Sequence, residues 1–94
     1  MGKRDVSYDP HLPFPQRWYR PGTTPRMPRA LIGHKCVGLN DQHGYLELPP
    51  HSPLQVGDMV GFGISHPCLT FDKWPVMMLV GADYDVVGAI RTFF

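Results

Sequence analysis

The chain has 94 residues, 43% of them hydrophobic, and a formal net charge of +1. A domain of this length buries only about 60–65% of the surface of its unfolded chain, so we expect one domain with a thin core. The small net charge disfavours a nucleic-acid-binding protein. No run of about 18 apolar residues occurs, which excludes a membrane-spanning helix. Eleven prolines argue against long helices and favour short strands joined by turns.

The charge is divided unevenly along the chain. Residues 1–30 have a balance of +4 and residues 31–94 a balance of −3. We expect residues 1–8 to form a first strand and residues 9–30 to form a basic, proline-rich connecting arm. Prolines recur in this arm every few residues, which predicts an extended segment rather than a central strand. Its Phe14, Trp18 and Tyr19 need cover by this domain or by a neighbour.

Residues 31–94 read as a β-domain. Apolar runs at short spacing predict strands over residues 34–40, 45–49, 59–65, 76–80 and 85–94, with turns at 41–44 and 81–84. A helical turn fits only residues 69–74. Gly61 and Gly63 indicate a bend or a close approach within their strand. Strands at this spacing predict an all-β protein, a small barrel or sandwich.

Two His-x-Cys triplets, "HKC" and "HPC", are the chemically distinctive feature of the sequence. Residues two apart on a strand point to one face, so His66 and Cys68 would present an imidazole beside a thiol. Pro67 disfavours the helical region for His66, which favours that extended geometry. Zinc binds imidazole nitrogen and thiolate sulfur, usually in a tetrahedron.

Several interpretations of the triplets remain open from spacing alone. Cys68 could be a small core residue and His66 a hydrogen-bonded one. His34, Cys36, His66 and Cys68 could instead form a closed structural zinc site. His66 and Cys68 could also hold an open, catalytic metal. A Cys–His nucleophile fits poorly, because residues two apart on a strand rarely bring the imidazole nitrogen to the sulfur.

Three stretches resemble a known family: "LNDQHGYLELP", "GDMVGFGISHPCLTFDKW" and "YDVVGAIRTFF". They are similar to the C-terminal domain of the D-serine dehydratase-like enzymes, which include bacterial D-amino-acid deaminases and are related to D-threonine aldolases. The resemblance extends over nearly the whole chain. It implies a β-domain like that of alanine racemase and the other fold-type III enzymes, which bind pyridoxal phosphate in a (β/α)8 barrel.

The resemblance implies roles for particular residues. His66 and Cys68 would bind zinc or another divalent metal, which would engage the β-hydroxyl of a D-amino-acid substrate. His43, in "QHG", is a second and weaker candidate, for a residue near the active site. Cys36 stands where the family would have an aliphatic residue, and Gln42 where relatives carry an acidic one. The departure at Cys36 disfavours the four-ligand site without excluding it.

The resemblance also implies missing parts. Pyridoxal phosphate needs a Schiff-base lysine within a fold that holds its phosphate, and 94 residues cannot contain a barrel of about 250. We therefore expect a chain that is inactive alone, whose arm packs on a barrel, and which self-associates through Trp18 and Tyr19. The resemblance implies a homo-oligomer. The alternatives are a stand-alone structural zinc or interaction module and a metal-free β-fold. Two cysteines without an export signal predict a cytoplasmic protein.

Overall fold

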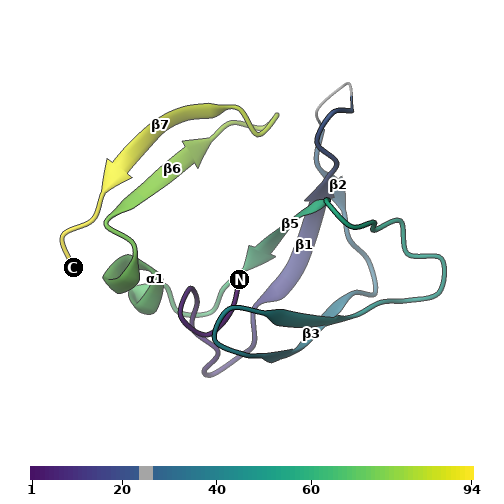
Figure 1. The fold of residues 1–94 in the computed structure, drawn as a ribbon, viewed down its shortest axis with the longest axis horizontal. Helices are drawn as coiled ribbons and strands as arrows, with labels where there is room; N and C mark the ends of the chain where they lie inside the picture. The colour runs from purple at the N-terminus through teal and green to yellow at the C-terminus, as the bar shows by residue number, and fades with distance from the viewer. Residues whose placement is uncertain (24–26) are drawn as a thin grey trace.

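A computed structural model describes residues 1–23 and 27–94 of the chain. The described residues form seven strands and one short helix, so the predicted all-β class is confirmed. The strands make three separate antiparallel sheets, and these sheets do not join into a closed barrel within the described part of the chain (Figure 1). No helix in that part is long and apolar enough to cross a membrane.

The largest sheet has strand β1 (Phe14–Tyr19) at its centre, between β2 (Arg29–Ala30) and β5 (Met59–Gly63). Two expectations from the sequence are therefore wrong. Residues 1–8 form turns instead of a first strand, and the proline-rich arm contains a central strand. The prolines are tolerated because the register shifts beside Pro15 and because β2 pairs with only two residues of β1.

Two of the three aromatic residues of the arm, Trp18 and Tyr19, are covered by this domain itself, whereas Phe14 is exposed. Trp18 is 6% exposed and Tyr19 is 8% exposed. The expectation that these two side chains are exposed in the isolated chain and available for self-association is wrong, because pairing of β1 with β5 places them in the core. Gly63 has a packing role here, since a Cβ on it would overlap the ring of Phe14. The close approach expected at this glycine is confirmed.

The other strands form two hairpins, as their alternating patterns predict. Strand β3 (Lys35–Leu39) pairs with β4 (Gly44–Glu47), and the hairpin lies against β1. Strand β6 (Val76–Val80) pairs with β7 (Val86–Arg91). Helix α1 (Cys68–Lys73) connects β5 to β6. The helical turn expected near residues 69–74 is thus present and begins one residue earlier.

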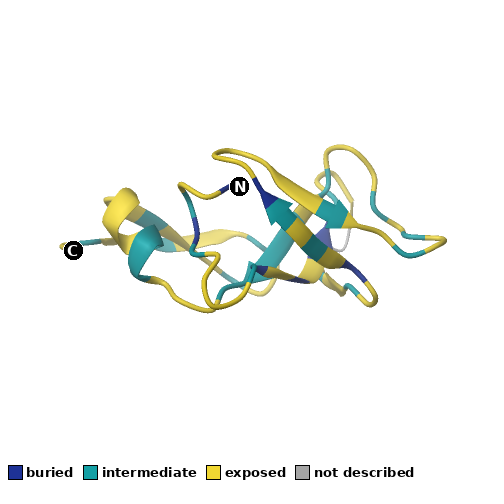
Figure 2. Cartoon of the chain, turned by 90° about the horizontal axis from the view of Figure 1, so that it is seen from below, coloured by how far each residue is buried: buried dark blue, intermediate teal, exposed yellow. Residues whose placement is uncertain are grey.

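The core lies in the first 40 residues. Every buried residue in the described chain has a number of 39 or lower, and residues 40–94 are half-buried or exposed (Figure 2). The radius of gyration is 14.0 Å, against about 12 Å for a compact chain of this length. The difference follows from the β6–β7 hairpin, which stands away from the other sheets (Figure 1).

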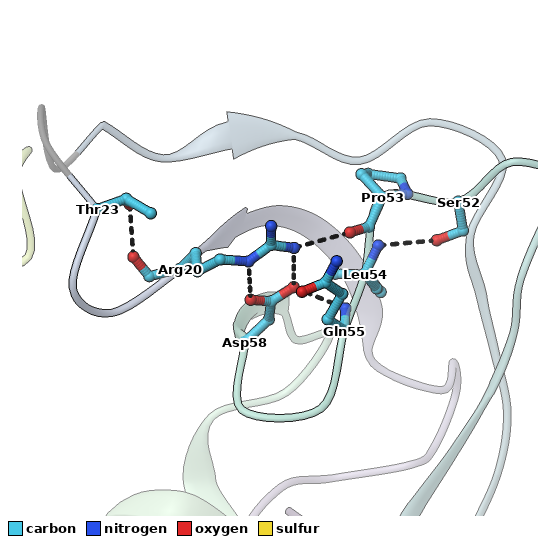
Figure 3. A network of polar contacts seen from close by, with 7 residues as sticks. All are labelled: Arg20, Thr23, Ser52, Pro53, Leu54, Gln55 and Asp58. Atoms are coloured by element: carbon cyan, nitrogen blue, oxygen red, sulfur yellow. Dashed lines mark hydrogen bonds and ion pairs between the residues drawn. The ribbon is translucent and has the colours of Figure 1, made fainter.

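A polar network joins β1 to the loop before β5 (Figure 3). The guanidinium of Arg20 donates from Nε to Asp58 Oδ1 at 2.8 Å and from Nη2 to Asp58 Oδ2 at 2.9 Å. Its Nη2 also donates to the Pro53 carbonyl at 2.9 Å, and the Gln55 amide donates to Asp58 Oδ2 at 2.8 Å. Two parallel bonds between a guanidinium and a carboxylate fix both distance and orientation. The network therefore holds the 49–58 loop on the sheet.

The same network predicts how stability depends on pH. Hydrogen bonding to Arg20 lowers the pKa of Asp58 from its ordinary value, against the opposing effect of burial. A lowered folded pKa stabilises the protein above the unfolded pKa of about 4, and this contribution is lost as the pH falls through the folded value. We expect the melting temperature to fall on acidification below about pH 4, and Asp58→Asn to lower it at pH 7 while flattening the acid decline.

Thermal unfolding followed by circular dichroism between pH 2 and pH 7 is the measurement, with Asp72→Asn as the matched control, because Asp72 is exposed. An equally steep acid decline in wild type and Asp58→Asn would show that this ion pair does not control acid stability.

Candidate functional site

The "HPC" triplet lies in the connection from β5 to α1, not on a strand. Strand β5 ends at Gly63, and Pro67 is the N-cap of α1 with φ −85° and ψ −10°. Cys68 is then the first helical residue. The predicted extended geometry for His66 and Cys68 is wrong. A proline suits a helix start because its missing N–H is one of the groups that the first turn leaves unpaired.

The His66 and Cys68 side chains of this triplet have no bonding partner in the described chain. His66 is exposed, and Cys68 is half-buried with a free thiol. Among the described residues, neither side chain has a hydrogen bond, an ion pair or a ring contact. An imidazole without an internal partner and a thiol two residues further on are thus available to a ligand from outside.

The His34 and Cys36 side chains of the "HKC" triplet, in contrast, are hydrogen-bonded within the domain. His34 is buried, with Nδ1 2.9 Å from the Ile32 carbonyl oxygen and Nε2 2.7 Å from Ser52 Oγ. The thiol of Cys36 donates to the Gly38 carbonyl at 3.6 Å. Both ring nitrogens of His34 therefore already have partners within the fold.

The four-ligand zinc site is a wrong prediction. The described residues contain no group of three or more His, Cys, Asp or Glu side chains placed to hold a metal. The physical reason is topological: the first triplet lies at the start of β3 and packs into the loop at residues 49–54, whereas the second lies in the connection from β5 to α1. Metal chemistry from this chain's described residues would therefore use two ligands at most in any one place.

The N-terminal segment, residues 1–13, braces the "HPC" connection on both sides. Ser65 Oγ donates to the His11 carbonyl at 3.2 Å, and Thr70 Oγ1 donates to the Asp5 carbonyl at 2.6 Å. Val6 is buried next to the second of these contacts in the sequence. The connection is thus fixed one residue before His66 and two residues after Cys68.

The same segment also binds the turn that carries His43. The amide of Lys3 donates to the Asn40 carbonyl at 2.8 Å, and the amide of Arg4 donates to the Asp41 carbonyl at 3.2 Å. His43 is exposed in this β3–β4 turn. Together with Lys3 and residues 40–42 it lines a shallow hollow of about 450 Å³. His43 does not form a ligand cluster with His66 and Cys68 in the described chain.

Gly2 is the residue of this segment that sequence reasoning missed. It is buried, and a Cβ on it would overlap the Asn40 carbonyl oxygen and lie 2.5 Å from the Asp41 carbonyl carbon. Nothing in the local sequence distinguishes Gly2 from a flexible terminal glycine, because the contact joins positions about 40 residues apart. The role of Thr70 was hidden for the same reason.

The chain is a small β-rich domain. Its β5–α1 connection, which is hydrogen-bonded to the N-terminal segment, carries an imidazole and a thiol that have no partner in the described chain. Residues 1–80 match the family described as "Putative serine dehydratase domain". The chain belongs to this family, and the resemblance seen in the sequence is confirmed. No curated protein matches the chain.

Replacing Gly2 tests whether the N-terminal segment braces the His43 turn. Gly2→Ala inserts a methyl group against backbone atoms that cannot rotate away, so we expect a destabilisation of about 1–3 kcal/mol. Amide hydrogen exchange at Lys3 and Arg4 should become faster, because their bonds to residues 40 and 41 lengthen.

The matched control is Gly38→Ala on β3, where a new Cβ would meet only ordinary contact at 3.9 Å from Tyr45. Gly2→Ala with unchanged stability and unchanged exchange at Lys3 and Arg4 would contradict the brace.

Proposed function

We propose that this chain is the metal-binding β-domain of a pyridoxal-phosphate-dependent D-amino-acid dehydratase or deaminase. Membership of the dehydratase family supports the reaction class. The single observation that carries the metal site is the contrast between the two triplets. The side chains of His34 and Cys36 are engaged in internal hydrogen bonds, whereas those of His66 and Cys68 have no partner among the described residues.

The donor set fits a divalent metal of borderline softness. Imidazole nitrogen and thiolate sulfur are the two donors that zinc binds most often in proteins. Two protein ligands leave coordination positions for water and substrate, and an open position distinguishes a catalytic zinc from a structural one. When bound, the metal supplies Lewis-acid chemistry at the substrate oxygen.

His66 and Cys68 have different tasks in this proposal. Cys68 binds as a thiolate at the first position of α1, and its partial burial limits its approach by water. His66 binds through a neutral ring nitrogen from the exposed side of the connection. The hydrogen bonds of Ser65 and Thr70 to the N-terminal segment restrain the chain before His66 and after Cys68. Hydrogen bonds that hold metal-binding residues in place raise metal affinity.

The reaction itself requires a second part, which we propose to be a (β/α)8 barrel that binds pyridoxal phosphate. That barrel would supply the Schiff-base lysine and bind the amino and carboxylate groups of the D-amino acid. This domain would then hold the β-hydroxyl of the substrate at the open positions of the metal. His43 is proposed to lie near the substrate from its exposed turn. Without the barrel, the domain binds metal and performs no elimination.

Metal titration of the purified chain tests the site. Co²⁺ bound by Cys68 should give a thiolate charge-transfer band in the near ultraviolet, and zinc should displace it. We expect Cys68→Ala to abolish this band and His66→Ala to weaken zinc binding by about 10–100-fold or more. Cys36→Ala is the matched control, because it removes the other thiol, and it should leave the band and the zinc affinity unchanged.

The cobalt-loaded chain then tests the substrate. D-Serine and D-alanine differ only in the β-hydroxyl, so D-serine should shift the visible bands of the cobalt at a lower concentration. A chain that binds no metal would favour the metal-free β-fold. Equal losses of affinity in Cys36→Ala and Cys68→Ala would contradict a site made by "HPC" alone, and equal responses to the two amino acids would contradict contact with the β-hydroxyl.

A further inference from the structure

His34 and Ser52 form a hydrogen-bonded pair that the proposed metal site does not use. His34 Nε2 lies 2.7 Å from Ser52 Oγ, and His34 Nδ1 lies 2.9 Å from the Ile32 carbonyl oxygen. His34 is buried, with an exposure of 9%, whereas Ser52 is half-buried. A hydroxyl, an imidazole and an oxygen acceptor in this order are the arrangement by which an adjacent base activates a serine. Ser52 is therefore a candidate nucleophile.

The partners of the imidazole decide the direction of its hydrogen bonds. A carbonyl oxygen can only accept, so His34 Nδ1 carries the ring hydrogen and donates it to Ile32. In the neutral ring, Nε2 then has a free lone pair, and the hydroxyl of Ser52 donates to it. General-base catalysis needs this direction, because the proton of the attacking hydroxyl moves to the base as the oxygen forms its new bond.

The backbone around Ser52 adds two features. The Leu54 amide donates to Ser52 Oγ at 3.3 Å (Figure 3). A donor at this oxygen stabilises the negative charge that develops as the proton leaves. His51, directly before Ser52, has a φ of 63°, in the left-handed region. Residues other than glycine seldom adopt this conformation, and they are found at active sites, including the sharp turns that present nucleophilic serines.

The fold fixes the position of the pair. The Ser52 amide donates to the Pro49 carbonyl at 3.3 Å. Arg20 Nη2 donates at 2.9 Å to the carbonyl of Pro53, the residue after Ser52. His34 directly precedes β3, and the pairing of β3 with β4 holds the base. The hydroxyl and the imidazole are thus already oriented for proton transfer, which lowers the entropic part of a reaction barrier.

We propose that Ser52, with His34 as its general base, is a nucleophile toward activated carboxylic esters. Ser52 Oγ bonds to the ester carbonyl carbon while its proton passes to His34 Nε2. The bond from this carbon to the leaving oxygen then breaks, and Nε2 returns the proton to that oxygen. Water hydrolyses the acyl-serine by the same route, which releases the carboxylic acid and restores the Ser52 hydroxyl. These steps use neither the proposed metal nor pyridoxal phosphate, so this activity is separate from the proposed function.

The other two serines of the chain provide an internal comparison. Ser7 Oγ donates to the Asp9 carbonyl at 2.9 Å. Ser65 Oγ donates to the His11 carbonyl at 3.2 Å. Each of these hydroxyls thus bonds to a carbonyl, which cannot take a proton, where Ser52 bonds to an imidazole. Ser7 is half-buried like Ser52, and Ser65 is exposed. Exposure alone would therefore favour reaction at Ser65.

Labelling of the purified chain with an alkyl fluorophosphonate, in the presence of a chelator, tests the nucleophile. The reagent forms a bond from Oγ to phosphorus and loses fluoride. Peptide mass spectrometry should locate the adduct at Ser52, formed about 100-fold or more faster than at Ser7 or Ser65. His34→Gln should slow the reaction at Ser52 by about 100-fold, because an amide cannot take the proton. Ser52→Ala should abolish the adduct, and Ser65→Ala, the matched control, should leave it unchanged.

Cleavage of p-nitrophenyl acetate tests the substrate class. We expect acetylation of Ser52 with release of p-nitrophenolate, lost in Ser52→Ala and kept in Ser65→Ala. Equal labelling of the three serines by the fluorophosphonate would overturn the proposal, and so would release of p-nitrophenolate that is unchanged in Ser52→Ala. Labelling of a folded His34→Gln at the wild-type rate would contradict the role of the base. If His34→Gln does not fold, the comparison of the three serines in the wild type still decides. Because the chelator removes zinc, failure of the proposed metal site would not change these results.

Discussion

The hydrogen bonds of the N-terminal segment are the constraint on which the candidate site depends. One stretch of 13 residues binds the β3–β4 turn through Lys3 and Arg4 and the β5–α1 connection through Thr70 and Ser65. These partners are 37 to 65 residues away in the chain. Without these bonds, a connection made of a histidine, a proline and a cysteine would have no fixed position relative to the sheet. These hydrogen bonds give the "HPC" connection a fixed position in the fold.

The first 40 residues and the last 20 residues are stabilised differently. The first 40 residues supply every buried apolar residue in the described chain, and the Arg20–Asp58 network ties their sheet to the loop before β5. The last 20 residues form a hairpin whose apolar side chains face outward. A single domain of this size cannot cover two apolar faces of a hairpin with its own core. The hairpin is thus where the chain depends on another surface, whereas the site depends on the chain itself.

The sequence predicted the strands whose pattern is local and missed the features that arise from distant pairing. Strands β3 to β7 and helix α1 follow from runs of apolar residues and from the turns between them. Strand β1 was missed because Pro13 and Pro15 suppress the strand signal, and pairing with β2 and β5 stabilises it. "HPC" was found by its residue types, but its geometry was misjudged because Pro67 begins a helix. The difference between the two triplets lies in the contacts of His34 with Ile32 and Ser52, which spacing cannot show.

X-ray absorption at the zinc edge of the zinc-loaded protein tests the central claim most directly, because it counts the sulfur atoms bound to each metal. We expect one sulfur at about 2.3 Å, with the remaining ligands nitrogen or oxygen at about 2.0–2.2 Å. Two sulfurs per zinc would place Cys36 in the same site as Cys68 and contradict a site made by "HPC" alone. A shell without sulfur would contradict it as well.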